Sequence, residues 1–227
     1  MTEKHAQTET GSNRSRADSV RANLLEAALA EASFEGWNST TLAKAARDAG
    51  YSTGEVQLYC PDGILDLIEV WSRQCDEAAR EQIQASKTKR IRDRITEAVM
   101  IRLETCAGEE EAAMRARARL MLPDGLDRGR KLVWATSDMI WRAIGDKSTD
   151  FNFYSKRTIL AGVYTSTLAI WLDERDLDKP KTRAFLDRRI ENVMQFEKAK
   201  GQWKKVSAGL PEITGLASRL RYGFDRR

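Results

Sequence analysis

Apolar residues recur every three to four positions along most of this 227-residue chain. From Ser19 onward the spacing is typical of amphipathic helices, and no useful length alternates between apolar and polar residues as a β-strand does. Val20, Leu24 and Ala28 mark one face of a first helix, which we expect to end at Gly36. The pattern therefore predicts an all-α protein.

Two short helices are predicted next, each between a capping residue and a turn. The first covers Thr41–Ala49, with a cap at position 39 or 40, and Gly50 ends it. The second covers about Gly54–Tyr59, with a cap at position 52 or 53. Together with the first helix they form a three-helix unit over residues 19–63.

A longer amphipathic helix follows the turn at Pro61-Asp62-Gly63. It places Ile64, Leu67, Ile68 and Trp71 on one face, which we expect to be buried. Further helices are expected at roughly 88–106, 109–121, 126–145, 151–173 and 180–200.

The stretch Thr158–Leu172 carries no charged residue and is apolar nearly all round. A helix of this kind is buried on all sides, so we expect it to be the central helix of its domain. It is shorter than the roughly 20 residues that span a bilayer, and no transmembrane helix is predicted. The predicted organisation is a disordered tail over 1–18, the three-helix unit over 19–63, a helical bundle over 64–200, and a linker with a terminal helix over 201–227.

The counts of histidine and cysteine narrow the possible chemistry. The single histidine, His5, lies in the polar N-terminal segment, which argues against Ser-His-Asp and Cys-His catalysis and most metal sites. Cys60, Cys75 and Cys106 are odd in number and lack C-x-x-C spacing, as expected for reduced structural thiols in the cytosol. No signal or transit peptide is recognisable. We therefore expect a cytoplasmic protein that is not an enzyme and uses no cofactor or metal.

The three-helix unit, with its tight turn at Gly50-Tyr51-Ser52, resembles the helix-turn-helix of the TetR regulator family. Small residues stand where the pattern of that family has them, at Thr40, Ala43, Ala46, Ala49, Gly50, Ser52 and Gly54. Small residues at a helix crossing are also a packing requirement that many bundles share. The resemblance implies a TetR-like fold, in which a helix-turn-helix unit precedes a helical ligand-binding bundle.

The segment that would read DNA lacks the residues for that task. Residues 50–63 contain no Lys or Arg, whereas Glu55 and Asp62 would be repelled by phosphates. The formal net charge of +4 is too small to imply a nucleic-acid partner. We therefore expect a packing module without specific nucleic-acid binding, and a TetR-type DNA-binding transcriptional repressor is the alternative function.

Three segments of the predicted bundle carry a more specific resemblance. They are Leu120-Met121-Leu122-Pro123, Ser137-Asp138-Met139-Ile140-Trp141, and the run GDKSTDFNFYSKR over 145–157, which precedes an apolar helix. These segments resemble the coenzyme Q biosynthesis accessory family, whose fold is similar to TetR. The resemblance covers about residues 20–195. It implies a homodimer that binds an isoprenoid lipid or quinone intermediate and presents it, at the membrane, to a hydroxylase of the ubiquinone pathway.

Eight apolar residues of the bundle are candidates for lining a lipid-binding cavity between helices. They are Leu120, Leu132, Val133, Ile140, Ile144, Ile159, Val163 and Leu168. The alternative is that these side chains only fill a core.

A second candidate site follows from the resemblance, because the partner-docking patch of the family maps onto Ile140, Trp141, Phe153, Tyr154 and Arg157. Phe153 stands where the family has tryptophan. Phe153, Tyr154 and Arg157 fall on neighbouring helical turns, and large aromatics with an arginine are common in protein–protein hot spots. The alternative is a buried core edge.

The chain ends in a predicted amphipathic helix that begins near Pro211. Its apolar stripe and neighbouring cations are candidate membrane-binding residues: Ile213, Leu216, Arg219, Leu220, Arg221 and Phe224. A basic amphipathic helix suits an anionic membrane surface, and we expect peripheral association with its inner face. The alternative is that this helix docks on its own or a partner subunit.

Overall fold

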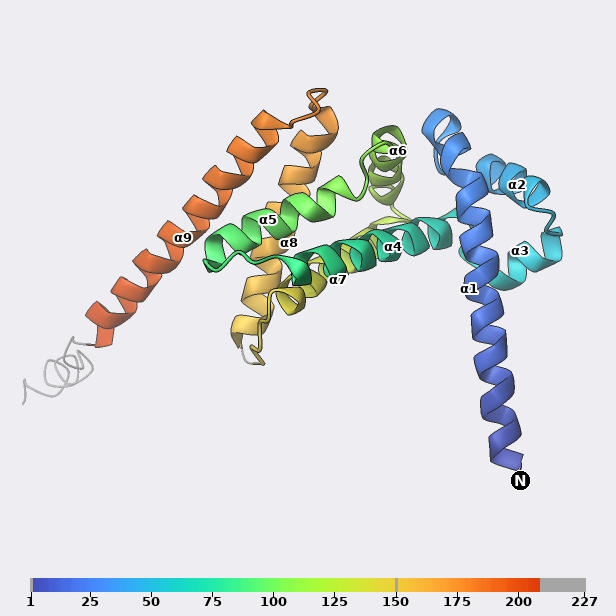
Figure 1. Ribbon diagram of the computed structural model, residues 1–227, viewed down its shortest axis with the longest axis horizontal. Helices are drawn as coiled ribbons and strands as arrows, with labels where there is room; N and C mark the ends of the chain where they lie inside the picture. Colours follow the sequence, from blue (N-terminus) through green and yellow to red (C-terminus); the bar gives the residue numbers. More distant parts are fainter. Residues whose placement is uncertain (1, 150, 209–227) are drawn as a thin grey trace, which may run out of the picture. The chain divides into compact units, whose positions relative to one another are not determined.

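The computed structural model describes residues 2–149 and 151–208, and every regular element in these ranges is a helix (Figure 1). This confirms the predicted all-α class. The contacts divide the chain into two units, Met1–Leu186 and Asp187–Arg227, with the boundary inside the last helix. The helices are α1 (Thr2–Glu35), α2 (Ser39–Asp48), α3 (Thr53–Tyr59), α4 (Ile64–Ala85), α5 (Ile91–Glu104), α6 (Glu110–Leu120), α7 (Leu126–Ala143), α8 (Phe151–Asp173) and α9 (Pro180–Ala208).

The two outer helices extend beyond their predicted ends. α1 begins at Thr2, so helix covers the segment over 1–18 for which the sequence predicted a disordered tail. The chain has no proline before Pro61, so nothing there forces a break in the helix. α9 continues past Gly201, where the sequence predicted a linker, and its described part ends at Ala208. A single glycine weakens a helix by about 1 kcal/mol and does not end it by itself.

Side-chain caps fix the starts of α2 and α3. Asn38, and neither of the predicted residues at 39 and 40, caps α2, since its Oδ1 accepts a hydrogen bond from the Thr41 backbone nitrogen at 3.0 Å. Ser52 caps α3 as predicted, in a capping box with Glu55. The backbone nitrogen of Ser52 donates to Glu55 Oε2 at 2.9 Å, and the backbone nitrogen of Glu55 donates to Ser52 Oγ at 3.3 Å.

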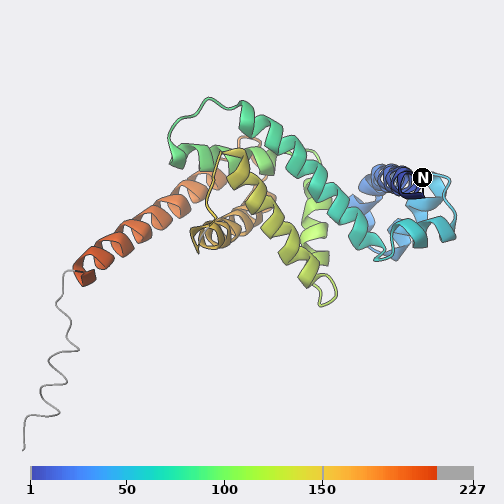
Figure 2. The ribbon, with the colours of Figure 1, turned by 90° about the horizontal axis from the view of Figure 1, so that it is seen from below.

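The three-helix unit is joined to the bundle by an aromatic contact. Trp37 follows α1 and is 2% exposed. Its Nε1 donates to the Ala112 carbonyl oxygen of α6 at 2.9 Å, and its ring stacks on Trp71 of α4 with centroids 5.5 Å apart. Figure 2 shows α4 running from the three-helix unit into the bundle. The two regions therefore share a hydrophobic core at this point.

The bundle is built around α4 and α7, which run alongside each other in Figure 1. α5 packs on α4, and α8 packs on α7. The buried side of α8 carries Leu160, Val163, Tyr164 and Trp171. Its other side is exposed at Gly162 and Thr165. The composition of α8 predicted a helix that is buried on all sides, but in the single chain one side stays open. No described helix combines the length and apolarity that a bilayer crossing requires.

Candidate functional site

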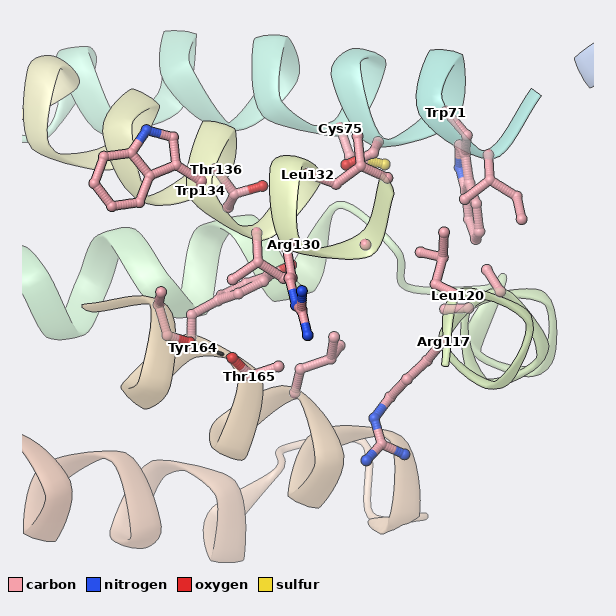
Figure 3. Close-up of a pocket in the computed structure, with 18 of the residues that line it drawn as sticks. Trp71, Cys75, Arg117, Leu120, Arg130, Leu132, Trp134, Thr136, Tyr164 and Thr165 are labelled. Atoms are coloured by element: carbon pink, nitrogen blue, oxygen red, sulfur yellow. Dashed lines mark hydrogen bonds between the residues drawn. The ribbon is translucent and has the colours of Figure 1, made fainter. Parts of the chain in front are cut away.

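A cavity of about 550 Å³ lies inside the bundle, and most of its wall is apolar. α4, α6, α7 and α8 supply most of the side chains (Figure 3). The apolar part of the wall includes Ile68, Trp71, Leu120, Leu132, Val133 and Leu168. We call this cavity the bundle pocket. Its size and composition are those of a site for a small, mainly apolar ligand.

One wall of the bundle pocket carries a buried ion pair. The Arg102 side chain of α5 is 5% exposed, and its Nε donates to Asp76 Oδ1 on α4 at 2.6 Å. Thr136 Oγ1 of α7 donates to the same carboxylate oxygen at 2.8 Å. Burial alone lowers the pKa of Arg102, but nearby Tyr164 and Asp76 raise it above the usual arginine value. Arg102 is therefore a permanent positive charge in an otherwise apolar enclosure.

Tyr164 lies close to this arginine. The centre of its ring is 5.9 Å from Arg102 Cζ, and the residue is 5% exposed. Burial raises the pKa of the Tyr164 phenol, so it stays protonated at neutral pH and can donate a hydrogen bond. Among the described residues, no hydrogen bond engages this hydroxyl. Tyr164 can therefore donate to a ligand oxygen close to the Arg102 charge, in a mostly apolar cavity.

Two further arginines, Arg117 of α6 and Arg130 of α7, line the bundle pocket from its exposed side. In Figure 3 the Arg130 side chain extends into the space between α7 and α8. No acidic side chain in the described ranges pairs with either of them. The nearby turn exposes Met121 to 63% and Leu122 to 49%. The exposed side of the bundle pocket is thus both cationic and apolar.

A second cluster forms where α7 meets the start of α8. Arg157 is 1% exposed, its Nε lies 2.6 Å from Asp138 Oδ1, and its Cζ lies 3.5 Å from the centre of the Phe153 ring. Tyr154 is 61% exposed, stacks on Trp134 with centroids 6.2 Å apart, and touches Phe153 edge-on. The result is an exposed aromatic surface that packs on a buried arginine.

This chain shares sequence with ubiquinone biosynthesis proteins. The family described as COQ9 matches residues 126–197. The chain is 28% identical to the mitochondrial ubiquinone biosynthesis protein COQ9 of Rattus norvegicus, over 90% of this chain and 68% of that protein. The identity to the Homo sapiens protein of the same name is 27%, over 90% of this chain and 67% of that protein. The chain is thus similar to COQ9 proteins over most of its length.

The fold of this chain is similar to that of a TetR regulator, as predicted. It aligns with a TetR transcriptional regulator from Nitrosomonas europaea at a TM-score of 0.62 and 18% sequence identity. The alignment covers 78% of this chain and 98% of that regulator. At this low identity the likeness concerns the arrangement of helices alone.

The surface of α3 does not have the chemistry of a DNA-reading helix. Its exposed side chains include Gln57 and Leu58, and Leu58 is 68% exposed. The two acidic residues expected to face phosphate have structural partners, since Glu55 caps α3 and Asp62 forms an ion pair with Arg128 of α7. α3 is thus placed like a reading helix without the cations that phosphate contacts require.

The eight predicted lipid-binding residues divide into two groups. Four of them line the bundle pocket, namely Leu120, Leu132, Val133 and Leu168. The other four are not in its wall: Ile140, Ile144 and Val163 are buried and Ile159 is partly buried. Apolar character does not indicate which way a residue faces on a helix that is covered on several sides.

The predicted partner patch needs a correction at two positions. Ile140 is 0% exposed and Arg157 is 1% exposed, so neither presents a side chain to a docking partner. The physical reason for Arg157 is that its charge is neutralised internally by Asp138 and Asp146. Trp141 and Phe153 are partly exposed and Tyr154 is exposed, so these three aromatics remain candidates.

Sequence reasoning missed the polar wall of the bundle pocket, which is made by Arg102, Tyr164, Cys75 and Cys106. One signal was available. Arg102 directly follows the apolar residues Met100 and Ile101 on a predicted helix. Arginine is mostly exposed, so a charge placed next to the apolar side of a helix is unusual. The predicted membrane-binding residues over 213–224 lie outside the described residues.

Proposed function

We propose that this protein is a non-enzymatic accessory protein of ubiquinone biosynthesis that holds an isoprenoid lipid or quinone intermediate in the bundle pocket. The observation that carries the proposal is an apolar cavity of about 550 Å³ with a buried arginine and a free phenol in its wall. The similarity to COQ9 proteins supplies the pathway, since these curated relatives are named for ubiquinone biosynthesis.

The ligand class follows from the wall. An isoprenoid chain offers only apolar surface, and each CH₂ it buries contributes about 0.8 kcal/mol. The oxygens of a quinone or phenol ring accept hydrogen bonds; Tyr164 can donate one, and the nearby Arg102 supplies a positive charge. Arg117 and Arg130 on the exposed side suit a negatively charged group as the lipid enters.

Presentation to an enzyme is the second part of the proposal. Trp141, Phe153 and Tyr154 form an aromatic surface of the kind that protein–protein hot spots use, and the hydroxylase of the pathway is its proposed partner. A homodimer is also proposed, and the exposed side of α8 at Gly162 and Thr165 is compatible with close helix packing. The basic segment over 213–224 is proposed to bind an anionic membrane surface on its cytoplasmic side.

The alternative function, a TetR-type repressor, shares the fold but has less support. The chemistry of α3 argues against it, because Gln57 is the one exposed side chain on that helix suited to reading a base edge in the part of the chain that is described. The accessory role predicts bound lipid without specific DNA binding, whereas the repressor predicts specific DNA binding. Both properties can be measured on one protein preparation.

The test uses two matched substitutions on α8. Leu168→Trp places a larger side chain in the wall of the bundle pocket, whereas Ile170→Trp makes the same change two residues away, outside that wall. Protein from ubiquinone-producing cells is extracted with organic solvent, and lipids are measured per folded chain. We expect the unsubstituted protein and Ile170→Trp to carry an isoprenoid lipid and Leu168→Trp to lose it. Equal lipid content in both variants would contradict the proposal.

A further inference from the structure

Two of the three cysteines meet in the wall of the bundle pocket. Cys75 lies on α4 and Cys106 lies in the turn after α5, and their Sγ atoms are 3.9 Å apart. Both side chains line the cavity. Cys60 is 3% exposed and is not part of that wall, so it serves as an internal reference.

The surroundings of the two thiols differ. Arg102 Nη1 donates to Cys106 Sγ at 3.6 Å, whereas Cys75 Sγ lies 3.9 Å from both Cys106 Sγ and the Thr105 carbonyl oxygen. A hydrogen bond from the Cys75 thiol, with the Arg102 charge, lowers the pKa of Cys106 although the site is buried. The same contact and burial raise the pKa of Cys75. The arrangement therefore favours the thiolate form on Cys106 and the protonated thiol on Cys75.

The other titratable groups around Cys106 do not reverse the lowering of its pKa. Asp76 of α4 is engaged by Arg102 and by Thr136, and Tyr164 of α8 stays protonated. Burial raises the pKa of Cys60, which leaves it as an unreactive thiol at neutral pH.

We propose that Cys106 and Cys75 form a peroxide-reactive dithiol that reduces an apolar hydroperoxide held in the bundle pocket. The Cys106 thiolate sulfur attacks the terminal oxygen of the hydroperoxide, the O–O bond breaks, and the alkoxide leaves and takes up the proton that Cys106 released on ionising, which water relays, to become an alcohol. Cys106 is then a sulfenic acid, and the Cys75 sulfur attacks it. The S–S bond forms, and the hydroxyl leaves as water with the proton of the Cys75 thiol. In total, two thiols and one hydroperoxide give one disulfide, one alcohol and one water.

The apolar body of the substrate follows from the cavity. Ile68, Trp71 and Val133 line the same cavity as the two thiols, so an alkyl or aryl hydroperoxide gains from leaving water whereas hydrogen peroxide does not. Arg102 is placed to stabilise the charge that develops on the leaving oxygen. This activity goes beyond the lipid-carrying role and does not depend on it, although both use the same cavity.

The experiment follows the thiols of the reduced, full-length protein at pH 7. Equimolar cumene hydroperoxide is added, the remaining thiols are blocked with N-ethylmaleimide, and the intact mass and the peptides are measured. We expect one blocked thiol, at Cys60, and a Cys75–Cys106 cross-link that dithiothreitol reverses. Cumyl alcohol, which has no O–O bond, should leave all three thiols free. Hydrogen peroxide should react about tenfold more slowly, because it gains nothing from the apolar wall.

Three variants assign the roles. Cys60→Ser should form the same disulfide at the same rate. Cys75→Ser should stop at a sulfenic acid on Cys106, which dimedone captures, and Cys106→Ser should lose the rapid reaction. The proposal is overturned if the unsubstituted protein keeps three free thiols, if Cys106→Ser reacts as fast as the unsubstituted protein, or if hydrogen peroxide reacts as fast as cumene hydroperoxide. Lipid content of the same preparation is measured separately, so a failure here is distinguishable from a failure of the lipid-carrying role.

Discussion

The three-helix unit of α1–α3 and the bundle of α4–α8 are both built as in a TetR regulator, but their chemistry differs. α3 stands where a reading helix stands, and it exposes Gln57 and Leu58 without a cation. The bundle encloses a cavity of about 550 Å³ and buries Arg102 in its wall. The proposal that the chain binds a ligand therefore rests on side-chain chemistry at the two sites and not on the shared fold.

The largest expected effect lies at the junction of the two regions. Trp37→Ala removes a side chain that is 2% exposed, its stacking on Trp71 and its hydrogen bond to Ala112. We expect a loss of about 3–5 kcal/mol in the free energy of unfolding, measured by urea denaturation. If the three-helix unit melts separately while the bundle stays folded, the two regions do not share a core.

The next effect concerns the buried charge of the bundle pocket. Arg102→Met leaves Asp76 without its cation, and we expect a loss of about 3 kcal/mol in the free energy of unfolding. The double variant Arg102→Met/Asp76→Leu should recover part of this loss, since no unpaired charge remains. A double variant that is less stable than Arg102→Met would contradict the assignment of the ion pair as the source of the loss.

A matched pair of surface changes compares the two regions directly. Tyr154→Asp alters an aromatic that is 61% exposed on the bundle, and Leu58→Asp alters one apolar side chain that is 68% exposed on α3. Both should change stability by less than about 1 kcal/mol, because exposed side chains contribute little. We expect ubiquinone content in cells to fall only with Tyr154→Asp. A fall with both, or with neither, would remove the proposed docking role of the bundle.

The smallest effect is expected from adding cations to α3. Thr53→Arg with Gln57→Lys supplies two phosphate contacts, and affinity for any duplex should rise only about tenfold at low salt and vanish at high salt. Fluorescence anisotropy against two unrelated duplexes measures this. Tight binding to one sequence over the other would show that the three-helix unit retains a reading geometry.

Much of the fold was predictable from local signals. The spacing of apolar residues predicted α7 over 126–145, and it spans Leu126–Ala143; Ser52 and Glu55 gave the start of α3 because a capping box is a local contact. The start of α1 and the length of α9 were not predicted, because the residues typical of caps at the expected boundaries, Asp18-Ser19 and Gly201, lie inside the helices.

The candidate site was predictable only in part, because it is assembled across helices. Asp76, Arg102, Thr136 and Tyr164 come from four different helices, and their contacts depend on helix rotations that periodicity does not fix. Leu132 faces the bundle pocket while Ile140, two turns later on the same helix, is in the core. Arg157 looked like a docking residue because its two acidic partners lie at 138 and 146, outside its own helix.

The most direct test of the central claim is to locate the bound lipid on the chain. An isoprenoid lipid carrying a photoreactive diazirine is bound to the purified protein and irradiated, and the labelled peptides are identified. We predict labels on the segments that line the bundle pocket, Leu120 with Leu132–Val133 and Ala161–Leu168, and their loss in Leu168→Trp. Labels confined to α1–α3, or unchanged labelling in Leu168→Trp, would contradict the account.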